Sequence, residues 1–316
     1  MHPAFSVIIF TTLSGAGYGL LSWAGLYAIA GHLPSGQLYG FTVMALSLGA
    51  VTVGLLSSTF HLGHPERAWR AFSQWRSSWL SREGVASCIT YLPAAVFGIG
   101  WVFFGAVTGA WAAAGLIAAL CSVATVICTA YIYRSLKTIP SWYNHWVVPN
   151  YVALSQMTGA LLLAALSDLF GYRLPGLYFL SVAAIIAALA CKLGYWRHID
   201  SDAPKSTLNT ATGLPGNVRL FEAPHTSENY LMKEMGYRIA RKHAQKLRRI
   251  ALVLAFLIPA GLIAIASLTG GVLPAVCSMV AAISAMAGVL TERWLFFAEA
   301  KHAVTLFYGR KLDQAA

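Results

Sequence analysis

The sequence predicts an all-α integral membrane protein with about eight transmembrane helices and both termini in the cytoplasm. Three observations lead to this prediction: the composition, a series of long apolar runs and the uneven placement of basic residues. Of 316 residues, 58% are hydrophobic and only 10% are charged, and the mean hydropathy is +0.64. These values exclude an ordinary soluble domain.

The apolar runs have the length that a membrane crossing needs. A hydrocarbon core of ~30 Å requires about 20 apolar residues of helix. Backbone polar groups in lipid must be hydrogen-bonded internally, so helices are the expected spanning elements. The runs follow one another along the chain and cover residues 5–30, 40–59, 84–104, 110–133, 147–166, 177–195, 250–268 and 272–297.

The first run is interpreted as a retained helix rather than a signal peptide. It has no basic segment or small-residue cleavage site in front of it, and it is too long for a signal peptide. Gly15, Gly17 and Gly19 lie within it. Small residues let helices approach closely in a membrane, so we expect these glycines to serve packing.

The connection 61–83, between the second and third runs, is expected to lie at the cytoplasmic membrane interface. Trp69, Phe72, Trp75 and Trp79 recur at spacings of three and four, which predicts one aromatic face on a short helix. Arg67 and Arg70 point elsewhere on such a helix and are candidates for contact with a soluble partner. A simple membrane anchor is the alternative for the aromatic residues.

The remaining connections differ greatly in length. Residues 105–109 and 269–271 barely separate their runs, so the flanking helices should pack as antiparallel hairpins. The connection 196–249 is long and its second half is basic, which predicts a basic helix leading into the seventh run. This helix is either an orientation signal or a docking surface for a soluble partner, and its candidate docking residues are Arg238, Arg241 and Lys242.

Basic residues set the predicted orientation. Of the 22 Lys and Arg residues, only Arg173 lies in a connection after the first, third, fifth or seventh run, and the others are placed on the opposite side. Basic residues stay on the cytoplasmic side, so both termini and the long connections should be cytoplasmic. The net charge of +11 then faces anionic lipid or a partner subunit, and nucleic-acid binding is not expected.

Metal and haem sites are not expected within this chain. None of the five cysteines forms a C-x-x-C pair, which argues against iron–sulfur and zinc ligation, and all lie in apolar runs as expected for buried small side chains. A bis-histidine haem needs two imidazoles inside the membrane, and no run holds a histidine well inside it.

His61 and Glu83 are the candidate site for chemistry. Each is predicted where an apolar run meets the interfacial connection, so antiparallel helices would bring them to the same depth. An imidazole can hydrogen-bond a quinone carbonyl and exchange a proton, and a carboxylate can relay that proton to water. Arg76 and Ser81, in the same segment, complete the candidate set. The alternatives are a backbone-bonded His61 and an ion pair of Glu83 with Arg82 or Arg76.

Several segments resemble one known family, the dimethyl sulfoxide reductase anchor subunits. These are His-Leu-Gly-His-Pro at 61–65, Arg-Ala-Trp at 67–69 and Ser-Trp-Leu-Ser-Arg-Glu at 78–83. Segments 1–17 and 219–226 are similar to one branch, the anchors of cytoplasmic sulfite dehydrogenases. The resemblance covers nearly the whole length, and its loop motifs are more specific than its helices.

The resemblance implies a subunit of a bacterial cytoplasmic-membrane complex that reacts with ubiquinone or menaquinone and binds no haem. Its implied partners are a ferredoxin-like four-cluster iron–sulfur subunit and a molybdopterin catalytic subunit. The family's quinol-site histidine and glutamate would fall on His61 and Glu83. The predicted cytoplasmic placement of the large connections favours sulfite oxidation, with electrons leaving to quinone. The subunit would not be catalytic alone.

Three other interpretations remain open from the sequence. The same anchor could oxidise quinol for a sulfoxide reductase, or it could be a structural tether without a working quinone site. A secondary transporter belongs to another class and would show broken helices and ionisable residues at mid-membrane. Here the charged residues are expected at helix ends, which argues against transport.

Overall fold

The computed structural model describes residues 5–61, 64–201, 207–219, 221–222 and 243–300, without the side chains of residues 61 and 65. Eight helices in this part of the protein are long and apolar enough to cross a membrane. The elements are α1 (Phe5–Ile29), α2 (Gln37–Ser57), η1 (Ser58–His61), η2 (Pro65–Phe72), α3 (Trp79–Phe104), α4 (Ala110–Arg134), α5 (Val147–Leu169), α6 (Leu177–Ser201), α7 (Leu208–Thr212), α10 (Ala244–Leu252), η3 (Val253–Leu257), α11 (Ile258–Leu268) and α12 (Leu273–Ala298).

The predicted all-α class and the eight spans are confirmed, but several helices extend beyond their apolar runs. α3 begins at Trp79 rather than at residue 84, and α6 continues to Ser201. The seventh span begins at Ala244 rather than at residue 250. An apolar run ends at the first polar residues, whereas a helix continues as long as its backbone hydrogen bonds continue. Glu83 therefore lies inside a helix and not at its boundary.

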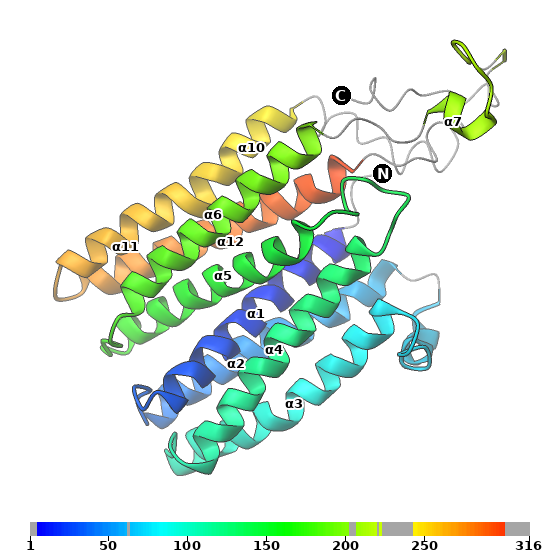
Figure 1. Cartoon of the computed structure of the whole chain (residues 1–316). Coiled ribbons are helices and arrows are strands. Elements are labelled where there is room, and N and C mark those ends of the chain that lie inside the picture. The colour runs from blue at the N-terminus through cyan, green and yellow to red at the C-terminus, as the bar shows by residue number, and fades with distance from the viewer. Residues whose placement is uncertain (1–4, 62–63, 202–206, 220, 223–242, 301–316) are drawn as a thin grey trace.

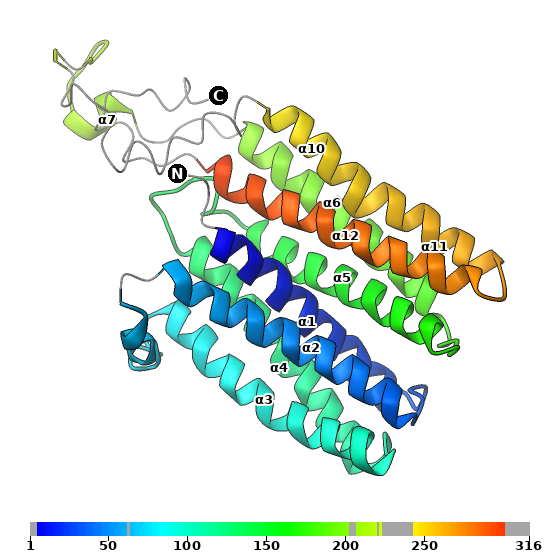
Figure 2. The same cartoon turned by 180° about the vertical axis from the view of Figure 1, so that it is seen from behind.

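α1 occupies the centre of the bundle. It packs against α2, α4 and α5 and also contacts α12, and α1 and α5 are the most buried spans. α2, α3 and α4 lie on one side of α1, while α6, α10, α11 and α12 lie beyond α5 (Figures 1 and 2). The predicted hairpins are confirmed, since α3 packs along α4 and α11 along α12. α1 starts and α12 ends at the same end of the bundle (Figure 1).

Glycines allow α1 to approach its neighbours closely. A Cβ atom at Gly19 would come within 1.9 Å of the Ser155 carbonyl oxygen, and one at Gly17 within 2.5 Å of the Ser47 carbonyl oxygen. The packing role predicted for these two residues is therefore confirmed. Gly15 differs, because a Cβ atom there would meet nothing within 4 Å.

The seventh span is continuous but contains a π-helical turn. Its segments α10, η3 and α11 follow one another from Ala244 to Leu268. Pro259 follows this π-helical turn and has no N–H, so it cannot donate a backbone hydrogen bond to the preceding turn. Ser284 of α12 donates a hydrogen bond of 2.8 Å to the Leu254 carbonyl oxygen and so joins the two helices at this point.

The segment between α2 and α3 differs from the single aromatic helix predicted. The 3₁₀-helix η2 ends at Phe72, Trp75 lies in a turn, and Trp79 opens α3. Ser78 begins the new helix because its hydroxyl accepts from the Ser81 amide, at 3.5 Å. Trp69 and Trp75 are exposed, whereas Trp79 stacks on Tyr131 of α4 with ring centres 4.3 Å apart. The aromatic residues therefore do not share one helical face.

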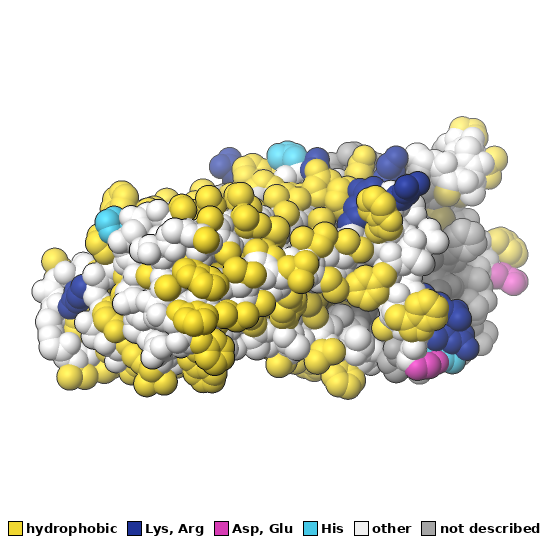
Figure 3. All heavy atoms as spheres, turned by 90° about the horizontal axis from the view of Figure 1, so that it is seen from below, with side chains coloured by type: hydrophobic (Ala, Val, Ile, Leu, Met, Phe, Trp, Pro, Cys, Tyr) yellow, Lys and Arg dark blue, Asp and Glu magenta, His cyan; other side chains and the backbone are white. Residues whose placement is uncertain are grey.

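Two further expectations are wrong in part. Only Cys277 is buried, and Cys88 is exposed. In a membrane protein the outer face of a span meets lipid, so an apolar run does not predict burial. Apolar side chains are spread over much of the face seen in Figure 3. Lys192 and Arg293 do not lie at helix ends, where the charged residues were expected: they are 1% and 2% exposed inside the bundle, and their helices continue to Ser201 and Ala298.

Candidate functional site

Glu83 is a buried carboxyl group near the end of the bundle that carries the start of α1. It lies about one turn inside α3 and is 3% exposed. Thr129 of α4 donates a hydrogen bond to its carboxylate oxygen. The Thr129 hydroxyl is also 3.1 Å from the Thr125 carbonyl oxygen. Because a hydroxyl both donates and accepts, Thr129 can serve Glu83 in either protonation state.

The ion pair considered for Glu83 is absent from the described residues. Arg82 instead donates to two backbone carbonyl oxygens, that of Trp75 at 3.0 Å and that of Arg76 at 2.6 Å. Its guanidinium group lies 4.3 Å from the ring centre of Trp79. Arg82 and Glu83 thus bond to different partners. Arg82 bonds to backbone carbonyl oxygens, and the buried Glu83 bonds to the Thr129 hydroxyl instead of to a cation.

Two other predicted quinone-site residues, Ser81 and Arg76, have described side chains. Ser81 is buried within the first turn of α3, and the Arg76 guanidinium lies 5.5 Å from the ring centre of the exposed Trp75. His61 ends η1, which packs against α1 and α2. Because its side chain is outside the described structure, the pairing of His61 with Glu83 stays a prediction.

The predicted docking residues are only partly described. Arg67 and Arg70 are exposed on η2, where Arg67 lies 3.7 Å from a Glu66 carboxylate oxygen and Arg70 lies over the Trp69 ring. Arg238, Arg241 and Lys242 lie outside the described residues. Within the described part of the protein, no three His, Cys, Asp or Glu side chains gather as metal ligands would.

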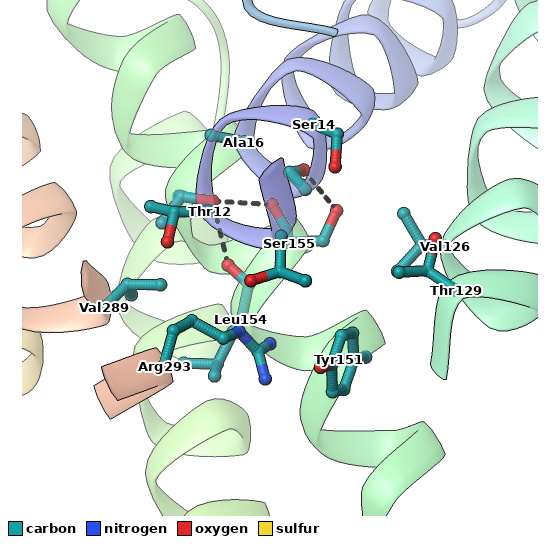
Figure 4. A pocket seen from close by; sticks show the side chains of 13 residues that line it. Thr12, Ser14, Ala16, Val126, Thr129, Tyr151, Leu154, Ser155, Val289 and Arg293 are labelled. Carbon is teal, nitrogen blue, oxygen red and sulfur yellow. Dashed lines mark hydrogen bonds between the residues drawn. The ribbon is translucent and has the colours of Figure 1, made fainter. Parts of the chain in front are cut away.

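A small cavity lies beside Thr129, between α1, α4, α5 and α12 (Figure 4). Its volume is about 10 Å³, the space of about one water molecule. Thr129 forms one wall and Tyr151 and Arg293 form another, with Thr12 above them (Figure 4). The hydroxyls of Thr12 and Tyr151 have no hydrogen-bond partner among the described residues. Polar side chains from four helices therefore reach the cavity, which adjoins the hydrogen-bond partner of Glu83.

Arg293 brings an incompletely bonded cation to this cavity. Its guanidinium carbon lies 3.7 Å from the Tyr151 ring centre, and its Nε lies 3.6 Å from the Glu292 Oε2 atom. Neither Nε nor Nη1 has a hydrogen-bond partner within the described residues. A buried guanidinium needs acceptors for its donors, so this position favours a polar occupant of the cavity.

A second buried ion pair continues from Arg293 toward α6. The Lys192 ammonium donates to Glu292, and both side chains are 1% exposed. The ammonium also lies 4.3 Å from the ring centre of Tyr195. This group was not predicted, because Lys192, Glu292 and Arg293 lie inside runs whose mean hydropathy is high enough for a membrane span. Three charges within apolar runs were the signal that could have revealed it.

A third cluster lies where α6 and α10 meet the end of α12. The Arg248 Nε is 2.8 Å from a Glu299 carboxylate oxygen, and its Nη1 is 2.6 Å from an oxygen of the half-exposed Asp200. Burial raises the pKa of the Glu299 carboxyl above its ordinary value, although Arg248 opposes this effect. Asp200 brings this cluster to the surface of the protein.

Eight spans define a multi-pass membrane protein, and comparison with known proteins assigns its family. The family profile of the DMSO reductase anchor subunit (DmsC) matches residues 1–310. The protein belongs to this family, as its resemblance in sequence predicted.

Two relatives carry the comparison further. The protein is 35% identical to a sulfite dehydrogenase subunit of Allochromatium vinosum over 325 aligned residues, 98% of this protein and 99% of the relative. It is 28% identical to one component of the anaerobic dimethyl sulfoxide reductase of Escherichia coli over 145 residues, 43% of this protein and 48% of that component. The protein is thus the anchor subunit of a complex of the sulfite dehydrogenase or DMSO reductase type.

Proposed function

We propose that this protein is the quinone-reactive anchor of a molybdopterin oxidoreductase that oxidises sulfite in the cytoplasm. Electrons pass from a four-cluster iron–sulfur subunit into the quinone pool. The buried Glu83, hydrogen-bonded by Thr129, is the observation that carries the proposal, because ionisable groups buried in a membrane protein are costly and mark functional sites. The full-length similarity to a sulfite dehydrogenase subunit favours sulfite as the source of electrons.

The proposed chemistry is proton delivery to a quinone that receives electrons from the partner. Reduction of a quinone to a quinol consumes two electrons and two protons. In this proposal His61, at the end of η1, hydrogen-bonds one quinone carbonyl, and Glu83 returns a proton to the site after each transfer. Ser81 and Arg76 lie in the same segment and help to hold the headgroup.

The reverse direction is the second candidate. The similarity to a component of an E. coli reductase favours an anchor that oxidises quinol, with the same residues accepting protons. The similarity is shorter and weaker than that to the sulfite dehydrogenase subunit, so sulfite oxidation is the primary proposal. The family assignment also favours an anchor over a secondary transporter.

The test compares two electron acceptors in the assembled complex. His61→Ala and Glu83→Gln should each lower sulfite-dependent quinone reduction by about 10²–10⁴-fold, since both remove a proton-transferring group. Reduction of a soluble artificial acceptor should be unchanged, because that path ends at the iron–sulfur clusters. Both activities are measured per assembled complex. Wild-type quinone reduction by a well-assembled His61→Ala complex would disprove the site.

A further inference from the structure

Seven carboxyl, ammonium and guanidinium groups at the Glu83 end of the bundle can be ordered from the surface inward, and we name them the buried charge series. Its members lie on α3, α6, α10 and α12 and at the end of α12. In order from the surface inward they are Asp200, Arg248, Glu299, Lys192, Glu292, Arg293 and Glu83.

The outer part of the series reaches water. The side chain of Asp200 is 54% exposed and is bonded to Arg248, which also bonds Glu299. The Glu299 side chain is only 9% exposed, and its partner Arg248 lies over the same Trp196 ring as Lys192, at 5.3 and 4.8 Å from the ring centre. A polar line therefore runs from the surface at α6 to the Lys192–Glu292 pair.

The inner part of the series ends at the cavity. Arg293 contacts Glu292 on one side and the cavity on the other, and Thr129 joins the far wall of the cavity to Glu83. The unbonded donors of Arg293 and the unbonded hydroxyls of Tyr151 and Thr12 converge there. One water molecule fits the volume and would find the polar partners that a buried water requires.

The charges are balanced in a way that suits proton transfer. The series contains three cations, Lys192, Arg248 and Arg293, and four carboxyl groups, Asp200, Glu299, Glu292 and Glu83. It is electrically neutral when one of the four carboxyl groups holds a proton. Once a proton has entered from the half-exposed Asp200, it can move among Glu299, Glu292 and Glu83 without changing the net charge of these buried groups, which is the costly quantity in a medium of low dielectric.

The direct approach to Glu83 is covered. Trp79 precedes Glu83 by four residues and so lies over the same face of α3, one turn nearer the aqueous end. It is stacked between Tyr131 and the Arg82 guanidinium. A proton that approaches Glu83 from this side would meet an aromatic stack and the positive charge of Arg82. A longer route lined by carboxyl groups is therefore favoured.

We propose that the buried charge series, completed by water in the cavity, is a proton inlet that carries protons from Asp200 laterally through the bundle to Glu83. This inference rests on the proposed function. Each step breaks one O–H bond and forms another, and the electrons for the quinone come from the partner subunit. Titratable groups that also face the route are Tyr18 of α1, Cys128 and Tyr133 of α4, Tyr151 of α5 and Tyr195 of α6.

The test removes the Lys192–Glu292 pair from the middle of the route; Arg293 then loses its Glu292 contact but keeps its contact with the Tyr151 ring. The double variant Lys192→Met with Glu292→Met replaces an ion pair by apolar side chains, a change that proteins often tolerate. In the complete complex, quinone reduction should fall at least about 10-fold, and its solvent deuterium isotope effect should rise because proton delivery becomes limiting. A small permeant weak acid should restore part of the rate. Reduction of a soluble acceptor by sulfite should not change.

Asp168→Asn is the matched control. This carboxyl lies near the C-terminal end of α5, at the end of the bundle opposite Glu83, and accepts a hydrogen bond from Tyr178. It should leave both the rate and the isotope effect unchanged. Wild-type quinone reduction with an unchanged isotope effect in the double variant would overturn the inlet. A parallel loss of both activities would also overturn it, by showing a structural role. Failure of the proposed function would appear earlier, as a wild-type complex that does not reduce quinone.

Discussion

At the scale of single residues, Thr129 explains how a carboxyl group can be buried in α3 without an ion pair. A buried polar group is costly unless it is hydrogen-bonded, and the Thr129 hydroxyl supplies that bond from α4. The same hydroxyl can accept from a protonated Glu83 while donating to the Thr125 carbonyl oxygen. Glu83 is thus held in place in both of its states.

Removal of this hydroxyl should impair quinone reduction. Thr129→Val keeps the shape of the side chain but leaves Glu83 without its bond, which typically costs about 1–3 kcal/mol for a buried group. We expect slower quinone reduction per assembled complex. Thr129→Ser retains the hydroxyl and should restore most of the rate. Equal rates for the Val and Ser variants would show that the hydroxyl is not used.

At the scale of helices, the close crossing of α1 and α5 holds the cavity in shape. Gly19 and Gly159 face each other, and a Cβ atom at Gly159 would lie 2.1 Å from the Gly19 carbonyl carbon. Ser155, one turn away from Gly159, donates to the Gly15 carbonyl oxygen at 2.7 Å and adds a polar contact to the same crossing. The helices touch through backbone atoms here, so no flexible side chain could move aside to make room for a Cβ atom.

Gly159→Ala should therefore separate α1 from α5. Overpacking typically costs about 1–3 kcal/mol, and here the clash is with backbone atoms. We expect a lower thermal midpoint for the purified complex in detergent, measured by loss of its assembled state. Gly49→Ala is the control, because a Cβ atom there would meet nothing within 4 Å. The crossing would be less important than inferred if both variants melted like the wild type.

At the scale of the whole molecule, orientation in the membrane decides which soluble partner can be reached. The Arg173 guanidinium lies at the end of the bundle opposite Glu83, where it donates to the Thr269 carbonyl oxygen at 3.0 Å. The described exposed basic residues at the other end include Arg67 and Arg70. This polarity supports the proposal that the partner binds at the end that contains Glu83.

Reporter fusions test the orientation. Fusions after Leu33, Gly171 and Gly271 should report the outside of the membrane, and fusions after Lys137 and Ala223 should report the inside. The reason is the concentration of basic residues on one side. A reversed pattern would contradict both the topology and a cytoplasmic catalytic partner.

The docking surface predicts a salt-dependent complex. Arg241 and Lys242 belong to a basic segment that should face acidic groups on the iron–sulfur subunit, together with Arg67 and Arg70. Reversal of both charges, Arg241→Glu with Lys242→Glu, should weaken co-purification of the subunits most strongly at low salt. A complex that survives this change and high salt equally well would be held by apolar contacts instead.

The class, the eight spans, the tight hairpins and the family all follow from the amino-acid sequence. These depend on properties that each segment carries alone: a run long enough to cross lipid, glycines at a turn, and motifs in the loops. The sequence also singles out Glu83, because a carboxyl beside an apolar run is conspicuous.

Which groups meet depends instead on the packing of the helices. Thr129 is 46 residues from Glu83 and Lys192 is 100 residues from Glu292, and no local pattern predicts such pairs. In the sequence, the charged residues of α6 and α12 are therefore only isolated charges within apolar runs. Packing brings them into one buried series, because a charge in a membrane span must find a partner on a neighbouring helix, and the helix crossings decide which neighbour that is.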